Sequence, residues 1–270
     1  MSRAGRARLA WVLALVLACA LTGCGSAMAT RPARPTGQRP SSPPARSVVG
    51  LGDSVMVGTH CHCSGPVAEY AEYAEAMQAC SGHRVRGIQL GTNGATTRDL
   101  IRLLSRAPAR RHVRDARVVL VIVGANDLLP QARRRRNSDC PASCYRPAVR
   151  AMGVRLRAIL ARVARIRAGR PGRVLVADYW NVFLGGRVGR RVEGETMLRW
   201  SRSVTRAANR AIRRAARSGH AGWVDLYRPF FGRDNDPTRL LAPDGDHPNA
   251  RGVAVMVRQL ARATPAGTFS

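Results

Sequence analysis

The sequence predicts one α/β domain in which helices cover both faces of a parallel β-sheet. From residue 47 onward, short apolar runs alternate with helical patterns, which is typical of parallel strands joined by helical crossovers. The run Val-Val-Leu-Val-Ile-Val at 118–123 consists mostly of β-branched residues, as expected for a strand that is covered on both faces. A chain of 270 residues is long enough to form one large domain with a substantial core.

Residues 1–23 are expected to be a targeting segment rather than part of the fold. Three Arg residues precede an apolar run at 9–21 that is too short to span a bilayer comfortably. The sequence Leu-Thr-Gly-Cys that follows resembles a bacterial lipobox, which implies cleavage before Cys24 and attachment of lipid to its thiol. An Ala-x-Ala sequence ending at Ala29 leaves ordinary secretion as the alternative. Both interpretations place the mature chain outside the cytoplasm.

Residues 24–46 are predicted to be a disordered tether, which leaves 47–270 as the folded domain. The tether is rich in proline and serine, and such a segment cannot bury enough apolar surface to fold. Its prolines are Pro32, Pro35, Pro40, Pro43 and Pro44.

The first strand and its turn are predicted at 48–54. Val48 and Val49 suit a buried strand, and the glycines at 50 and 52 permit a tight turn at its end. A second strand is predicted at 85–90. The sequence Thr-Thr-Arg-Asp at 96–99 resembles a capping box, which starts a helix.

The second half of the domain continues the alternation after the strand at 118–123. The helix predicted at 147–168 has an apolar face and ends before Gly169 and Pro171. The later elements are expected in the order strand 174–177, helix 196–218, strand 223–226 and helix 249–263. The arginines predicted on the solvent face of the helix at 147–168 are Arg150, Arg155, Arg157, Arg162 and Arg165.

Five cysteines follow the tether, and an exported chain can form disulfides. Cys140 and Cys144 are placed to form a local bridge across a loop, whereas Cys80 could pair with either Cys61 or Cys63. Five is an odd number, so at least one thiol is left over. The close spacing of Cys61 and Cys63 matches no usual zinc site.

The chain is strongly basic, with 45 basic and 16 acidic residues and a net charge of +29. Every basic residue is Arg, and codon composition alone could produce that bias. The functional interpretation is attraction to anionic polymers or lipid headgroups. Nucleic-acid binding is disfavoured, because aromatic residues make up only 5% of the chain and no nucleic-acid-binding motif is present.

A serine and a histidine are the candidate catalytic residues. Ser54 ends a Gly-Asp-Ser turn at the carboxyl edge of the predicted sheet, where open α/β folds place their chemistry. Asp244 and His247 are three residues apart, so one turn can bring the carboxylate to the imidazole. The structural alternatives are a helix-capping role for Ser54 and a helix start at Asp244 to His247.

Two further strand ends offer hydrogen-bond donors to a developing oxyanion. Asn126 follows the strand at 118–123, and Gly94 lies in the polar loop that follows the strand at 85–90. Either segment could instead be an ordinary turn, because Asn, Asp and Gly are common there.

These four stretches together resemble the SGNH (GDSL) hydrolase superfamily. Its marker residues fall here at Ser54, Gly94, Asn126 and His247, in the order of that superfamily and over roughly 48–260. The Gly-x-Ser-x-Gly elbow of the other large esterase fold is absent around Ser54.

The resemblance implies a flavodoxin-like three-layer α/β/α sandwich with a five-stranded parallel sheet. It also implies that Ser54 attacks an ester carbonyl and that His247 acts as general base, with Asp244 holding its ring. The backbone N–H groups of Ser54 and Gly94 and the amide of Asn126 would form the oxyanion hole. No cofactor and no metal are expected.

Neighbouring residues receive supporting roles in this interpretation. Asp53 and Asp127 are expected to brace their loops, and Asp246 is expected to face solvent. The loop at 128–146 either overhangs the site or is a solvated insertion pinned by a disulfide. The segment 179–183 either lines a substrate pocket or packs in the core.

The sequence therefore predicts an exported, monomeric serine esterase that is attached to the membrane through a lipid anchor. Its substrate would be a lipid ester or an acetylated envelope glycan, and no specific nucleic-acid partner is expected. The alternatives are an acyl or acetyl transferase and a non-catalytic envelope-binding module on the same fold.

Overall fold

A computed structural model describes residues 46–59, 61 and 69–269 of the chain. The predicted targeting segment, Cys24, the tether as far as residue 45, and Cys63 lie outside the described residues. Within the described part, no helix combines the length and the apolar character needed to cross a bilayer.

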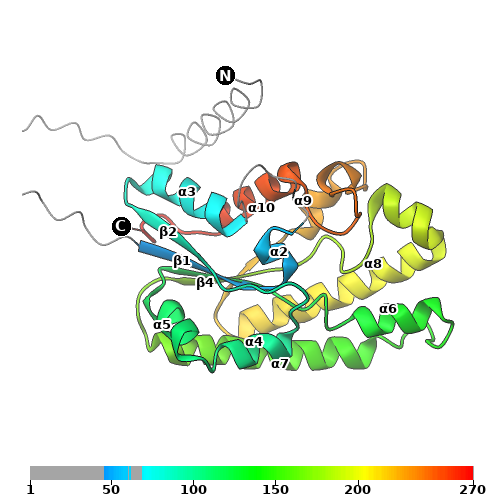
Figure 1. Ribbon diagram of the computed structural model, residues 1–270, viewed down its shortest axis with the longest axis horizontal. Coiled ribbons are helices and arrows are strands. Elements are labelled where there is room, and N and C mark those ends of the chain that lie inside the picture. The colour runs from blue at the N-terminus through cyan, green and yellow to red at the C-terminus, as the bar shows by residue number, and fades with distance from the viewer. Residues whose placement is uncertain (1–45, 60, 62–68, 270) are drawn as a thin grey trace, which may run out of the picture.

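Five parallel strands form one sheet in the order β2-β1-β3-β4-β5. The first strand of the chain is therefore an inner strand, and its carboxyl end lies between those of β2 and β3 (Figure 1). The strands are β1 (Arg46–Gly52), β2 (Val85–Gln89), β3 (Val118–Ile122), β4 (Arg173–Ala177) and β5 (Gly222–Val224).

Helices cover both faces of the sheet, which confirms the predicted three-layer arrangement (Figure 1). One layer contains α4 (Thr97–Leu103), α5 (Ala107–Asp115), α7 (Arg146–Arg167) and α8 (Gly186–Ser218), and the α4, α5 and α8 helices all pack against α7. The other contains α3 (Glu69–Ser81) and α10 (Ala250–Arg262), which pack on each other. The shorter elements are α2 (Ser54–Val57), α6 (Leu129–Arg136), α9 (Tyr227–Phe231) and a 3₁₀ turn at Thr238–Leu240.

The close packing of β1 on β3 fixes the end of the first strand. All five residues of β3 are buried. A Cβ atom at Gly52 would lie 2.0 Å from the carbonyl oxygen of Ile122, so only glycine fits there. The next residue, Asp53, donates its backbone N–H to the same oxygen at 3.1 Å. The chain therefore leaves the sheet at a defined point, one residue before Ser54.

Five helices were not predicted from the sequence, namely α2, α3, α5, α6 and α9. The α3 segment is rich in Glu and Ala and has few large apolar residues, although Tyr73 and Met77 are buried. The α6 helix consists largely of arginine, so no apolar face marks it in the sequence.

The helix predicted at 196–218 follows a kink at Gly194, whose φ is 74°. A further helical stretch, which begins at Gly186 and precedes the kink, was not predicted. The last strand ends at Val224 rather than at 226. There the carboxylate of Asp178 accepts the backbone N–H of Leu226 at 2.7 Å, so this N–H bonds to a side chain instead of continuing the sheet.

Candidate active site

Ser54 occupies the first turn of α2, immediately after β1. Asp53, not Ser54, caps this helix, because its Oδ1 accepts the backbone N–H of Val55 at 3.1 Å. The helix ends after one turn at Gly58, whose φ of 77° suits glycine. The serine hydroxyl is therefore not used for capping and is available for other contacts.

His247 and Asp244 lie in a turn just before α10. An antiparallel bridge between Leu241 and Pro248 closes this turn, and Gly245 within it has a φ of 74°. The Oδ1 atom of Asp244 accepts the backbone N–H groups of Asp246 and His247 at 3.0 and 3.1 Å. Burial acts to raise the pKa of Asp244, but these bonds and the imidazole hold that pKa below its ordinary value.

The three side chains form a continuous hydrogen-bonded chain. The Oγ atom of Ser54 lies 2.9 Å from Nε2 of His247, and Nδ1 of His247 lies 2.7 Å from Oδ2 of Asp244. An ionised carboxylate can only accept, so Nδ1 carries the proton and Nε2 is free to accept from the serine. This arrangement can transfer the serine proton to the imidazole as the oxygen attacks an electrophile.

Asn126 reaches the same pocket from the end of β3. Its Nδ2 donates one proton to the carbonyl oxygen of Ala95 at 3.0 Å, which orients the amide and leaves its second proton available. Gly94 precedes Ala95 on an exposed loop and has a φ of 72°. Gly94 does not line the pocket itself. Within the described chain, the backbone N–H groups of Ser54 and Gly94 donate no hydrogen bond.

Asp127 braces the Asn126 turn, as predicted. Its carboxylate accepts the backbone N–H and the hydroxyl of Thr97 at 2.8 and 2.6 Å. Arg155 of α7 donates to Asp127 Oδ1 and to the Thr97 hydroxyl, each at 2.7 Å. The prediction that Arg155 faces solvent was wrong, because its side chain is 26% exposed and pairs with a carboxylate that is 2% exposed.

Asp53 braces the serine turn and also lines the pocket. Its Oδ2 accepts the hydroxyl of Tyr179 at 2.6 Å, and both residues are buried. Burial raises the pKa of Asp53 to about 6, against the opposing effect of the tyrosine hydrogen bond. Burial and the adjacent carboxylate also raise the pKa of Tyr179. This tyrosine contact was missed from the sequence, since 126 positions separate the two residues.

The pocket around Ser54 is small, with a volume of about 50 Å³. At about 30 Å³ per water molecule in the liquid, a space of that size corresponds to about two waters. Val55, Leu129 and Val182 form much of its apolar wall. Trp180 also lines it and stacks on Phe230, with ring centroids 4.2 Å apart. The segment 179–183 therefore both lines the pocket and belongs to the buried core.

Asp246 does not face solvent as predicted. It is partly buried and lines the pocket beside His247. Burial raises its pKa to about 6, because desolvation disfavours the charged carboxylate. Its backbone carbonyl accepts the indole N–H of Trp180 at 3.0 Å, which ties the histidine turn to the pocket wall.

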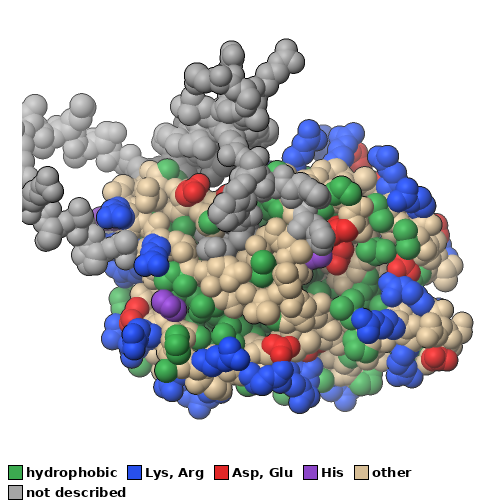
Figure 2. All heavy atoms as spheres, viewed as in Figure 1, with side chains coloured by type: hydrophobic (Ala, Val, Ile, Leu, Met, Phe, Trp, Pro, Cys, Tyr) green, Lys and Arg blue, Asp and Glu red, His purple; other side chains and the backbone are tan. Residues whose placement is uncertain are grey.

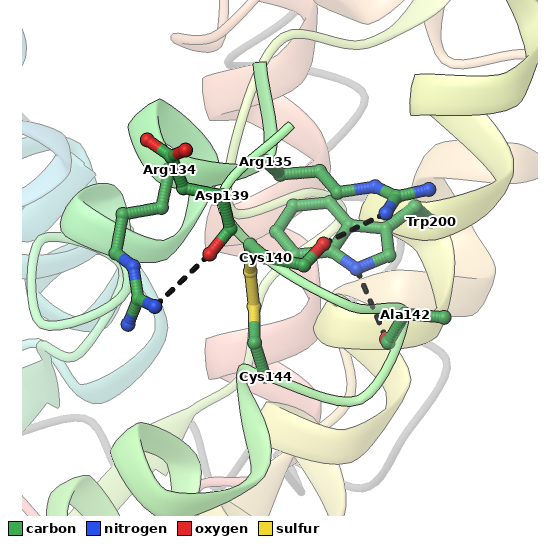
Figure 3. The surroundings of a disulfide bond; sticks show 7 residues. All are labelled: Arg134, Arg135, Asp139, Cys140, Ala142, Cys144 and Trp200. Atoms are coloured by element: carbon green, nitrogen blue, oxygen red, sulfur yellow. Dashed lines mark hydrogen bonds between the residues drawn. A yellow bond between two sulfur atoms is a disulfide. The ribbon is translucent and has the colours of Figure 1, made fainter. Parts of the chain in front are cut away.

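The predicted bridge between Cys140 and Cys144 is present and closes the loop after α6 (Figure 3). Arg134 and Arg135 donate to the carbonyl oxygens of Asp139 and Cys140 at 3.0 and 2.8 Å, and Trp200 donates to that of Ala142 at 3.1 Å. These bonds fasten the loop to α6 and α8. Since Leu129 at the start of α6 lines the pocket, the insertion also borders the site.

The other cysteines are partly described. Cys61 and Cys80 are both disulfide-bonded, while Cys63 lies outside the described residues, so the pairing among the three stays a prediction. In the part of the chain that the structure covers, no three His, Cys, Asp or Glu side chains gather in a group that could hold a metal ion.

Comparison with known proteins places this geometry in context. The profile of the GDSL-like lipase/acylhydrolase family matches residues 51–255. The structure is similar to that of a lipase from a goat rumen metagenome, with a TM-score of 0.66 and 19% identity over 81% of this chain and 97% of the other. It is also similar to a variant of an acetyl xylan esterase from Geobacillus stearothermophilus, with a TM-score of 0.57 and 16% identity over 81% and 94% of the two chains. The search of curated proteins returned no match.

Proposed function

Since the chain belongs to the GDSL-like lipase/acylhydrolase family of ester-hydrolysing enzymes, we propose that it is an exported serine esterase that removes short acyl groups from hydroxyl groups. The observation that supports this most directly is the hydrogen-bonded chain from Ser54 Oγ through His247 to Asp244, at 2.9 and 2.7 Å.

In the proposed reaction, His247 Nε2 takes the proton of Ser54 while Oγ attacks the ester carbonyl carbon. The negative charge that develops on the carbonyl oxygen is stabilised by the backbone N–H groups of Ser54 and Gly94 and by the free amide proton of Asn126. The imidazolium then protonates the leaving alcohol, and an acyl-serine remains. Water, deprotonated by His247, attacks this ester and releases the carboxylic acid and the free serine.

Asp244 keeps the imidazole in the tautomer that this sequence of steps needs. Its carboxylate accepts from Nδ1 and is itself fixed by two backbone N–H groups. The lowered pKa of Asp244 supports the role, because the group stays ionised while His247 gains and loses a proton.

The size of the pocket supports short acyl groups such as acetyl. A cavity of about 50 Å³ is well below the roughly 300 Å³ at which pockets begin to hold drug-sized ligands. An acetyl or propionyl group would contact Val55, Leu129 and Val182, whereas a long lipid chain would have to leave the pocket.

Export and lipid attachment at Cys24 are part of the proposal. The Cys140–Cys144 disulfide supports an oxidising compartment, and the lipobox-like sequence supports a membrane anchor. In a bacterial host, Cys24→Ser should shift the protein from the membrane fraction to the medium. Release of the wild type into the medium to the same extent as Cys24→Ser would contradict lipid attachment at this residue.

The main test is hydrolysis of p-nitrophenyl esters from acetate to palmitate by the wild type, Ser54→Ala and Ser105→Ala. Ser105 is exposed and lies outside the pocket, so its substitution is a matched control. We expect a maximum at acetate or propionate and a loss of at least about 10³-fold for Ser54→Ala. Turnover that survives in Ser54→Ala would refute the proposed nucleophile, and a maximum at palmitate would refute the short-acyl preference.

A further inference from the structure

A second cavity, of about 250 Å³, lies between α7 and α8, away from the catalytic pocket. Both helices belong to the same layer on one face of the sheet (Figure 1). We refer to this cavity as the arginine groove, because five arginines line it. They are Arg146, Arg150 and Arg157 of α7 and Arg210 and Arg214 of α8.

Small residues on the two helices form the floor of the arginine groove. Gly153 packs so closely that a Cβ atom there would lie 3.3 Å from the Cβ of Ala211. Ala207 and the buried Val149 also line the floor. Val149, Gly153 and Ala211 are buried whereas the five arginines are exposed, so the arginines form the rim of the groove.

The five arginines of the groove have no internal partner for their charge. Within the described residues, none of them forms an ion pair or a side-chain hydrogen bond, and no acidic residue lines the cavity. By contrast, Arg155 on the same helix pairs with Asp127, and Arg136 pairs with Glu193. Five unneutralised guanidinium groups around one cavity repel one another and attract anions.

The shape of the groove favours a linear ligand over a flat surface. Arg146 and Arg157 are eleven residues apart on α7, which corresponds to about 16 Å along the helix axis. Guanidinium groups bind carboxylate and phosphate through paired hydrogen bonds. A planar membrane would meet the rim arginines but could not fill the concave floor.

The apolar residues between the arginines favour a sugar chain over a nucleic acid. Val154 is 50% exposed within this charged surrounding, and the ring of Tyr145 lies at one end of the groove. Tyr145 is partly buried and makes an edge contact with Trp200, so it offers little open ring face for stacking a base. Binding of single-stranded nucleic acid normally uses such stacking.

We infer that the arginine groove is a binding site for a linear acidic glycan, a polysaccharide whose sugars carry carboxylate or phosphate groups. The rim arginines would bind the acidic groups, while Val154 and the groove floor contact the apolar faces of the sugar rings. This site takes no part in the ester chemistry, so it can be tested without turnover.

The test measures binding by fluorescence anisotropy near 0.15 M salt, where charges that lie more than about 8 Å apart are largely screened. The probes are labelled oligogalacturonate, phosphorylated oligomannan and a neutral xylo-oligosaccharide of equal length. All proteins carry Ser54→Ala, so that the proposed ester chemistry cannot contribute to the signal. One variant combines Arg150→Gln and Arg214→Gln, one substitution from each wall. The control combines Arg110→Gln and Arg111→Gln, two exposed arginines of α5.

We expect at least one of the two acidic probes to bind and the neutral probe not to bind. The groove variant should lose about tenfold in affinity for that acidic probe, because each exposed charge pair contributes up to a few-fold. The control variant should lose less than about twofold, with the same change in net charge.

Equal losses in the two variants would overturn the proposal, because binding would then follow net charge alone. Absence of binding to both acidic probes would also overturn it. Tighter binding of single-stranded DNA or of phosphatidylglycerol vesicles through the same two arginines would also overturn it, because the groove would then bind a ligand of another class. Hydrolysis of p-nitrophenyl acetate is measured separately with the wild type, in which Ser54 is intact. A failure of glycan binding therefore does not affect the proposed esterase activity.

Discussion

Replacing Arg155 with methionine should weaken both the fold and the active site. Arg155 donates to Asp127 and to Thr97, which connects α7 to the turn after β3 and to the start of α4. The substitution removes two hydrogen bonds donated by the charged guanidinium, one to the carboxylate of Asp127 and one to the neutral hydroxyl of Thr97. Among the described residues, the backbone N–H and the hydroxyl of Thr97 then remain the donors to the carboxylate of Asp127, which is 2% exposed.

The expected cost is about 2–3 kcal/mol of unfolding free energy. Breaking a buried ion pair by removing one partner costs about 3–5 kcal/mol, but Arg155 is 26% exposed, so water can partly replace it. For a domain of this size, that loss lowers the melting temperature by about 5–10 °C. Because Asn126 precedes Asp127, the rate of ester hydrolysis should also fall, whereas KM should change less. Thermal unfolding and p-nitrophenyl acetate kinetics measure the two effects.

Arg165→Met is the matched control, since Arg165 is exposed on the same helix. A second comparison places Arg155→Met in an Asp127→Asn background, where its cost should shrink by at least about 1 kcal/mol. If Arg155→Met and Arg165→Met destabilise the protein equally, the ion pair does not hold the Asn126 turn, and the reasoning is wrong.

Three further predictions concern the catalytic chain, the buried carboxyl and the disulfide. Asp244→Asn should lower kcat by about 10³–10⁴-fold while binding of the ester changes little, because the amide cannot hold His247 in its required tautomer; steady-state kinetics would contradict this with a loss below tenfold. Asp53, whose pKa rises from 3.8 to about 6 on folding, binds its proton more tightly in the folded state, so its contribution to stability is present below pH 4 and is lost as the pH rises through 6. Asp53→Asn should reduce that loss of unfolding free energy by about 2–3 kcal/mol. Urea unfolding at pH 4 and pH 7.5 measures it, and an equal change in unfolding free energy between the two pH values in wild type and variant would exclude the prediction. Replacing Cys140 and Cys144 together by serine should lower the unfolding free energy by about 2 kcal/mol, as expected for a short closed loop. An unchanged urea midpoint would contradict this and show that the hydrogen bonds of the loop hold it without the disulfide.

The sequence was sufficient to predict the sheet and the site residues that follow its strands. Ser54, Asn126 and His247 each occupy short polar stretches next to apolar ones, and the structure brings all three to one pocket. Gly94 is the exception among the four marker residues, since it lies beside the pocket rather than in its wall. Its neighbour Ala95 nevertheless accepts a hydrogen bond from Asn126.

Contacts between distant polar residues could not be predicted from the sequence. Arg155 is one of several arginines at helical spacing, and no local signal separates it from its exposed neighbours. The bond between Tyr179 and Asp53 joins the ends of β4 and β1, which are not adjacent in the sheet. The exposure of Asp246 was misjudged for the same reason, because the indole of Trp180 that holds its backbone comes from the β4 end.

The arginine bias of the chain explains why it has many cationic side chains but not where they lie in the fold. If codon composition alone governed them, arginines would be found on solvated surfaces, as Arg110 and Arg165 are. Arg167 is instead buried and donates to the carbonyl oxygens of Val113 and Ala116 at 3.2 and 2.6 Å, which binds the end of α7 to the end of α5. Arg155 is likewise committed to an internal partner. Some arginines of the chain therefore stabilise the fold through hydrogen bonds from the guanidinium group to internal acceptors.

The arginines of the groove form a third group, since they surround a concave surface without such partners. Neutral substitutions should therefore be tolerated at Arg110, should destabilise the fold at Arg167, and should affect ligand binding rather than stability at Arg150.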